Sequence, residues 1–300
     1  MVTHYGARYA MGTRLEIVAW DLSEKAFQSL LSEITEEVNR IENVLSVYSR
    51  TSFIHNLNSR ANEKPVLLNN EIWSLVQNCL RFNRKTKGAF DITLGLSHDL
   101  SKYDENSNER RDSSMSGATD TLILDSQRHS IQFSHPGMSL DFGAIGKGYT
   151  LDKVRSIVTS AGVNNALINF GRSIIYAKGN HPSGNPWNIG IQTPGFASKP
   201  INITATLDDL FLSTSASFRG KGTTAELHPH IIDPRSGAPV NEMRQVSITS
   251  STGIEAEALS TALVVLSDTE GNWIIKEFPE SQIVKIFNSN ALPNLAGSSN

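Results

Sequence analysis

Residues 140–152, LDFGAIGKGYTLD, bring three glycines, a lysine and two aspartates to a point where a strand-like run becomes a helix-like run. Glycine lets the backbone approach a ligand closely, and the free amides at a helix N-terminus attract anions. Lys147 adds a compact positive charge. The combination indicates a turn that handles phosphate and a metal ion. Because its spacing matches neither the P-loop nor the dinucleotide fingerprint, a plain glycine turn with a solvated lysine remains the alternative.

Further polar side chains gather in three later segments. Residues 212–217, LSTSAS, offer a run of hydroxyls, and residues 228–239, HPHIIDPRSGAP, combine imidazoles and a carboxylate with turn-forming proline and glycine. In residues 255–263, EAEALSTAL, Glu257 and Thr261 are four positions apart on a helix-like run, so they would share one face. Taken alone, Glu257 suits a surface ion pair and Thr261 a bond to its own helix backbone.

Three earlier motifs complete a pattern: MGT at 11–13, LSVY at 45–48 and TKGAFDIT at 86–93. In this order, with FGAIGKGYTLD followed by HIIDPRSG, the chain resembles the ApbE family, the FAD:protein FMN transferases, from about Ala10 to Phe287. The resemblance implies an α+β, T-fold-like mixed fold of two interlocked αβ halves with the site at their junction. It also implies magnesium-dependent transfer of FMN from FAD to a threonine of a target protein, with release of AMP. Some family members instead hydrolyse FAD to FMN and AMP.

The resemblance assigns a metal site and a proton acceptor. Magnesium, or manganese in its place, would be held by the Ala144 carbonyl, the Glu257 carboxylate and the Thr261 hydroxyl. Magnesium prefers hard oxygen ligands and keeps several waters, so a single protein carboxylate is enough. His230 would take the proton of the incoming threonine hydroxyl, because histidine alone titrates near neutral pH without help. A lone histidine before an apolar pair is more often structural, so this role depends on the resemblance.

The other residues assigned by the resemblance would surround FAD. They are Lys147 against the phosphates, Asp141 orienting the lysine turn, Tyr48 on the flavin ring, Met11 packing the cofactor, Thr214 and Ser215 near the flavin, and Asp91 at the adenosine half. An aromatic side chain suits the flat flavin ring. Ordinary core packing is the alternative role for Met11 and for Tyr48. Asp152 is expected at a helix start or behind the site.

Two positions depart from the family pattern. The metal carboxylate of the family is usually an aspartate, whereas this chain has Glu257, and the usual Gly-Gly-Asp after the asparagine strand is Gly171-Arg172-Ser173. Arg172 could bind a phosphate through two parallel bonds or block the path of the acceptor. Three hypotheses therefore stand beside one another: an FMN transferase, a metal-dependent FAD pyrophosphatase, and a catalytically degenerate FAD-binding protein.

Composition allows an enzyme of this kind. The 300 residues are 39% hydrophobic and 19% charged, which is ordinary for a folded globular protein. A net charge of -3 without a long basic run argues against nucleic acid as a partner, and Cys79 is the only cysteine, which excludes an intramolecular disulfide. No apolar run is long enough for an integral membrane segment, and no signal peptide is visible. The chain as given is expected in the cytoplasm, or in the periplasm if a leader has been removed.

Periodicity predicts mixed helices and strands in one domain over residues 1–287. Strands are expected at 13–20, 121–124, 130–133, 166–170, 174–177, 187–191, 201–207 and 283–287. Helices are expected from Ser23–Glu24 through Ile41, from about 70 to 86 with an asparagine cap, from about 150 to 161, and from 255 to 266. A polar segment at about 97–120 is typical of a mobile surface loop, and residues 288–300 are expected to form a disordered tail.

Overall fold

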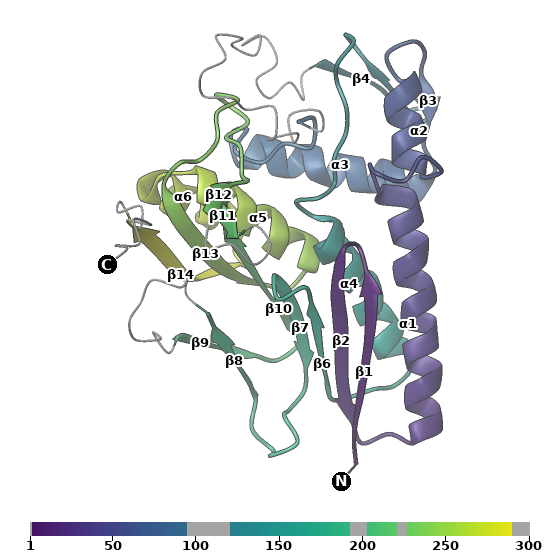
Figure 1. Cartoon of the computed structure of the whole chain (residues 1–300), viewed down its shortest axis with the longest axis vertical. Coiled ribbons are helices and arrows are strands. Elements are labelled where there is room, and N and C mark those ends of the chain that lie inside the picture. Colours follow the sequence, from purple (N-terminus) through teal and green to yellow (C-terminus); the bar gives the residue numbers. More distant parts are fainter. Residues whose placement is uncertain (1, 95–120, 193–202, 221–226, 290–300) are drawn as a thin grey trace, which may run out of the picture.

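The computed structural model describes residues 2–94, 121–192, 203–220 and 227–289 (Figure 1). These ranges contain helices and antiparallel sheets, which confirms the expected α+β class. The loop predicted at 97–120 lies entirely outside the described residues, as do residues 290–300 of the predicted tail. Within these ranges, no helix combines the length and the apolar character needed to cross a membrane.

A seven-stranded antiparallel sheet forms the centre of the fold, in the order β1-β2-β6-β7-β10-β13-β14. Its strands are β1 (Thr3–Ala10), β2 (Thr13–Trp20), β6 (Ala166–Phe170), β7 (Ile174–Lys178), β10 (Leu210–Ala216), β13 (Met243–Ser250) and β14 (Gln282–Ser289). The N-terminal hairpin joins the middle of the chain where β2 pairs with β6, with Leu15 opposite Phe170. The sheet therefore sets motifs from both ends of the sequence next to one another.

Three helices pack on one face of this sheet: α1 (Glu24–Leu45), α4 (Gly146–Ser160) and α5 (Gly253–Val265). Apolar side chains at helical spacing on α1 and α4 meet the inward-facing residues of β2, β6 and β7 in one core. Ser23 begins α1 by accepting a hydrogen bond from the Ala26 amide at 3.2 Å, as the sequence predicts. Burial of this apolar stripe is what holds α1 against the sheet.

The opposite face of the sheet is covered in part by a two-stranded hairpin, β8 (Trp187–Ile191) and β9 (Ile203–Leu207). Trp187 and Leu207 from the hairpin pack with Ala177 and Leu212 from the sheet in a separate apolar cluster. The hairpin lies at the lower left of Figure 1, to the left of β7 and β10. The sheet thus has helices on one side and strands on the other.

A second core lies between α5 and the elements that follow α1. These are α2 (Phe53–Arg60), β3 (Val66–Leu67), α3 (Asn70–Lys85), β4 (Leu122–Asp125) and β5 (Ser130–Phe133). The asparagine cap predicted for α3 is Asn69, which accepts the Ile72 amide at 2.9 Å. Beyond α5 come α6 (Asp268–Ile274) and a short 3₁₀ turn (Ile275–Glu277), and a small hairpin joins β11 (Phe218–Gly220) to β12 (Leu227–Pro229).

Several predicted boundaries were wrong. Helix α4 begins at Gly146 rather than at about residue 150, and β14 runs through Ser289, two residues into the predicted tail. Strands β1, β10 and β13 and helices α2 and α6 were not predicted. Strand β13 is buried on both faces, so its residues show no alternation, and the serines and threonine of β10 resemble a polar turn.

Candidate functional site

Helices α4 and α5 touch backbone to backbone at two glycines. A Cβ placed on Gly148 would lie 2.3 Å from the Gly253 carbonyl oxygen, and one on Gly253 would lie 2.4 Å from the Gly148 carbonyl oxygen. No real side-chain carbon fits at these distances, so glycine is required at both positions for the helices to approach so closely. The first turns of the two helices are thereby held together, and both carry predicted site residues.

Glu257 lies at this contact and is 4% exposed. One carboxylate oxygen accepts the Gly148 amide at 2.6 Å, and the other lies 2.6 Å from the Lys147 ammonium. The residue before α4, Ile145, offers no side-chain cap, so Glu257 serves as the cap of that helix from 109 positions away. The Lys147 ammonium and the positive end of helix α4 thus meet at one buried carboxylate.

Asp152 performs the reciprocal task from α4. Its two carboxylate oxygens accept the Gly253 amide at 2.6 Å and the Ile254 amide at 2.9 Å, at the start of α5. Thr252, the residue before α5, makes no side-chain cap of its own. Burial raises the pKa of Asp152 to about 6, against the lowering effect of the two amide bonds. The sequence pointed to a helix start for this aspartate, and the helix concerned is α5.

A cluster of hydroxyls lies beside Glu257, between β10 and α5. Ser260 contacts Ser213 at 2.9 Å and Ser215 at 2.8 Å, and Ser215 is 3.3 Å from Thr261. Thr261 and Glu257 are one helical turn apart on α5. The structure therefore brings the predicted Ser215, Glu257 and Thr261 to one side of the sheet.

Thr214 lies on the other side of the same sheet. Strand residues alternate between faces, and Thr214 contacts Ser247 of β13 at 2.9 Å while its neighbours meet α5. It lines a cavity of about 220 Å³ between the sheet and β8, whose other lining residues are Asn169, Arg172, Ser173, Ile175, Ile189, Gly190, Ile191, Gln192 and Leu212. The predicted pair Thr214 and Ser215 is thus split between the two faces of the sheet. Arg172 lines the same cavity as Thr214.

Asp141 and Asp91 organise two neighbouring turns. Asp141 accepts the Gly143 amide at 2.7 Å, which holds the turn that contains Ala144 and precedes α4. Asp91 accepts both the amide and the hydroxyl of Thr93 at 2.7 Å. The two turns lie side by side because the Asp141 amide donates to the Ile92 carbonyl at 2.8 Å. The two aspartates therefore hold a pair of joined turns, one of which leads into α4.

Met11 and Tyr48 occupy different surroundings. Met11 has a φ of 47° in the turn between β1 and β2, and its sulfur lies 3.6 Å from the Thr150 hydroxyl of α4. This places the methionine close to the first turns of α4. Tyr48 is 88% exposed, and its ring makes no hydrogen bond or ring contact within the described part of the chain. An exposed aromatic side chain of this kind is available to a flat ligand.

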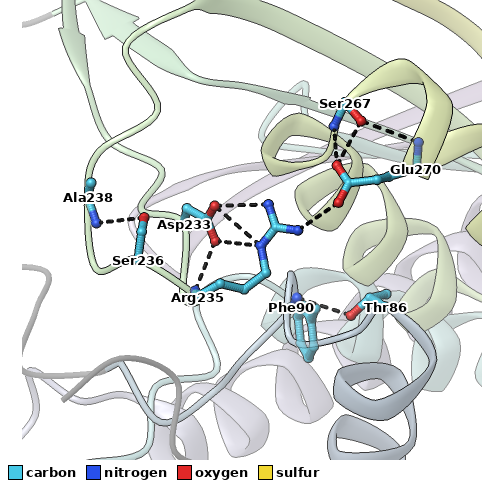
Figure 2. Close-up of polar contacts among 8 residues, drawn as sticks. All are labelled: Thr86, Phe90, Asp233, Arg235, Ser236, Ala238, Ser267 and Glu270. Carbon is cyan, nitrogen blue, oxygen red and sulfur yellow. Dashed lines mark hydrogen bonds and ion pairs between the residues drawn. The ribbon is translucent and has the colours of Figure 1, made fainter. Parts of the chain in front are cut away.

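His230 follows β12 and is tied to the end of β10 by its amide, which donates to the Ser217 carbonyl at 2.9 Å. The turn that follows is closed by Asp233, which accepts the Arg235 amide at 2.9 Å, and by Ser236, which accepts the Ala238 amide at 3.3 Å (Figure 2). Asp233 and Ser236 hold this turn, as its Asp-Pro and Ser-Gly pairs indicate.

A polar network that the sequence did not reveal joins α4 to α1 and α3. Glu71, at the start of α3, accepts Tyr149 at 2.6 Å and Arg40 of α1 at 2.8 Å. Arg40 and, second, Tyr149 lower the pKa of Glu71 to about 2. Lys153 lies 3.6 Å from the same carboxylate. Tyr149 stands in the GKGY motif, but its hydrogen-bond partner Glu71 is 78 positions away, so no local pattern could identify it.

The expected metal ligands suit magnesium in their chemistry, since they offer a carboxylate, a hydroxyl and a carbonyl oxygen. Among the described residues, no group of three or more His, Cys, Asp and Glu side chains is placed to hold a metal ion. The predicted set contains only one such side chain, Glu257, and both of its oxygens already have partners. A cation on this carboxylate would therefore compete with the Lys147 ammonium.

Comparison with known proteins gives consistent matches. The model of the ApbE family matches residues 11–285. The chain is 24% identical over 279 residues to the FAD:protein FMN transferase of Klebsiella pneumoniae (strain 342), covering 89% of this chain and 79% of that protein. It is 28% identical over 286 residues to the protein of the same name from Treponema pallidum (strain Nichols), covering 86% and 76%. The solved structure of flavin transferase ApbE from Vibrio cholerae shares the fold, with a TM-score of 0.79 at 21% identity over 96% of this chain and 97% of that one.

Proposed function

Since the chain belongs to the ApbE family, we propose that it is an enzyme that transfers FMN from FAD to a protein acceptor. In full, the proposed reaction is magnesium-dependent, attaches FMN to a threonine of the acceptor and releases AMP. The observation that supports it best is the meeting of Lys147, Glu257 and the first turn of α4 at one point. A positive side chain, a helix N-terminus and a buried carboxylate are the groups that pyrophosphate cleavage needs.

The bond changes follow from the substrate. The threonine oxygen forms a bond to the phosphorus on the FMN side of the pyrophosphate, and the bond from that phosphorus to the bridging oxygen breaks. AMP leaves with the electron pair. His230 takes the proton of the hydroxyl, and Lys147 lies against the phosphates and offsets their negative charge. Each of these roles is part of the proposal.

The metal would be held by the Ala144 carbonyl, Glu257 and Thr261. When bound, magnesium acts as a Lewis acid that neutralises charge on the phosphate oxygens. Lys147 would then leave Glu257 and be available to the phosphates of FAD. Tyr48 would stack on the flavin, and Asp91 and Asp141 would shape the turns around the nucleotide.

The test is incubation of the purified protein with FAD, with and without Mg²⁺ or Mn²⁺, in the presence of a threonine-bearing flavoprotein domain. Chromatography separates FAD, FMN and AMP, and the mass of the domain reports covalent flavin. We expect metal-dependent AMP release in equal amount with flavin bound to the domain. The variant His230→Asn should transfer FMN at a rate lowered by about 100-fold or more, whereas His181→Asn, which changes an exposed histidine, should retain the native rate.

Two other results would give a different function. FMN and AMP without modified domain, across several acceptors, would identify an FAD pyrophosphatase. Intact FAD under every metal would identify a binding protein. The variant Glu257→Asp adds a further distinction, because the shorter side chain cannot keep both the Gly148 and Lys147 contacts. We expect it to lower turnover; a large gain would mark the glutamate as a degenerate ligand.

A further inference from the structure

We propose that Arg235 is a positioning residue that holds His230 in place for proton transfer. The inference rests on the function proposed above, and it adds a residue outside the set that the sequence singled out. Arg235 lies five positions after His230, in the turn shown in Figure 2, and its guanidinium contacts two carboxylates from different parts of the chain.

Within the turn, Arg235 binds Asp233 with one edge of its guanidinium group. The Arg235 Nε lies 3.0 Å from one Asp233 oxygen, and a terminal nitrogen lies 2.9 Å from the other. The Asp233 carboxylate also accepts the Arg235 amide at 2.9 Å. Two parallel bonds from a planar guanidinium fix the orientation of both groups, which a single ammonium cannot do.

The remaining terminal nitrogen joins the turn to α6. It donates to Glu270 at 3.1 Å, and Glu270 is itself fixed by a capping box with Ser267, in which the carboxylate accepts the Ser267 amide at 2.9 Å and hydroxyl at 2.8 Å. Helix α6 directly follows α5, which carries Glu257 and Thr261. Arg235 thus ties the turn to the same helical unit that holds the predicted metal ligands.

A third segment also reaches Arg235. A Cβ placed on Gly88 would lie 3.6 Å from the Arg235 Cγ, so the arginine stem runs along the turn between α3 and Asp91. Gly88 has a φ of +80°, and the following Phe90 amide donates to the Thr86 hydroxyl at 3.1 Å (Figure 2). Arg235 therefore contacts three segments: the turn that follows His230, helix α6, and the turn at Gly88 that leads to Asp91.

The connection from Arg235 back to His230 is a stiff hairpin. Asp233 donates its amide to the Ala238 carbonyl at 2.8 Å, and Val240 donates its amide to the Ile231 carbonyl at 2.9 Å. Two prolines limit the backbone freedom of the same segment. At the base of the hairpin the His230 amide binds the Ser217 carbonyl. Because these hydrogen bonds join the tip of the hairpin to its base, an arginine that holds the tip also restrains the position of His230.

The ion pairs themselves add little stability. The Arg235 side chain is 33% exposed and that of Glu270 48%, and pairs this exposed contribute weakly to folding. A position error of about 1 Å at a reacting group, by contrast, costs about 100-fold in rate. Arg235→Ala should therefore lower kcat by about 10- to 100-fold, with the KM for FAD changed less than about threefold.

A double-mutant cycle with His230 tests the inference. Arg235→Ala is made in the native chain and in His230→Asn, and Arg128→Ala, which changes an 81% exposed arginine, is the control. We expect Arg235→Ala to lower kcat in the native chain and to have no further effect once His230 is absent. The kcat of Arg235→Lys should lie between those of the native chain and of Arg235→Ala. Dissolved guanidinium should restore part of the rate that Arg235→Ala loses.

Each other outcome overturns the inference. An equal loss in both backgrounds would show that Arg235 does not act through His230, as would an unchanged kcat or a His230→Asn variant of native activity. If the native chain transfers no FMN, the proposed function fails by itself. Hydrogen exchange of the His230, Asp233 and Val240 amides then decides: faster exchange in Arg235→Ala than in Arg128→Ala supports positioning, and equal exchange rejects it.

Discussion

Glu257 and Asp152 cap each other's helices. Glu257, on α5, accepts the Gly148 amide of α4 at 2.6 Å, while Asp152, on α4, accepts the first two amides of α5 at 2.6 and 2.9 Å. Neither helix has a side-chain cap from its own preceding residue. The two carboxylates therefore hold the predicted metal ligand, the lysine and the α4 N-terminus in one rigid unit.

The first prediction concerns the charge of Glu257. In Lys147→Met the carboxylate stays buried without its ammonium, so the free energy of unfolding in metal-free buffer should fall by about 3 kcal/mol. The double variant Lys147→Met/Glu257→Gln should recover most of that loss, because the neutral amide keeps an acceptor for Gly148. Urea unfolding at pH 7 measures both values, and an equal loss in the single and double variants would contradict the charge argument.

The second prediction concerns the glycine contact. A methyl group at residue 148 would lie 2.3 Å from the Gly253 oxygen, whereas at Gly146 no atom lies within 4 Å of the added carbon. Gly148→Ala should therefore separate the helices and lower the unfolding free energy by about 3 kcal/mol or more, and Gly146→Ala should be neutral or stabilising. Thermal unfolding of the pair is the measurement. Similar melting temperatures would show that α4 and α5 separate without cost.

The sequence predicted the family pattern and most helices, because α1 and α3 have clear caps and apolar stripes. It also placed Glu257 and Thr261 correctly on one helix face. It missed the start of α4, since the cap of that helix is Glu257, 109 positions later, and no local signal precedes Gly146. Long-range capping of this kind is invisible to periodicity.

Side-chain direction was the other limit. Thr214 and Ser215 are adjacent in sequence and were predicted to act together, but strand alternation sends them to opposite faces. Their strand was itself unpredicted, so the alternation could not be applied. Arg235 went unnoticed because its partner Glu270 lies 35 positions away, on a helix that the sequence did not predict.

The third prediction concerns acid stability. Glu71 has a pKa of about 2 in the folded protein, below its ordinary value of 4.5, so its contribution is present above pH 4.5 and is lost as the pH falls toward 2. Glu71→Gln should cost about 2 kcal/mol at pH 7, a figure reduced for a side chain that is 25% exposed. Denaturation from pH 7 to pH 2.5 should show the difference from the native chain shrinking. A constant difference would mean that the Arg40 and Tyr149 bonds act independently of charge.

The last prediction concerns Asp152, whose effect on stability should change with pH in the opposite direction to that of Glu71. Asp152 has a folded pKa of about 6, above its ordinary 3.8, so between these values the native state holds more protons than the unfolded state. The unfolding free energy contributed by this group therefore falls as the pH rises through 6. Asp152→Asn does not titrate and keeps one acceptor for the α5 amides. The unfolding free energy of the native chain minus that of Asp152→Asn should therefore fall by about 2 to 3 kcal/mol from pH 4 to pH 7.5.

Urea unfolding at intervals of one pH unit measures this difference, and taking the difference removes the other titrating groups. Asp125→Asn, at a carboxylate whose side chain is 44% exposed, is the matched control for replacing an aspartate by asparagine. A native-minus-variant difference that rises with pH would show that the Gly253 and Ile254 amides outweigh burial. The charged form of Asp152 would then be the one that holds α5, and with it Glu257, against α4.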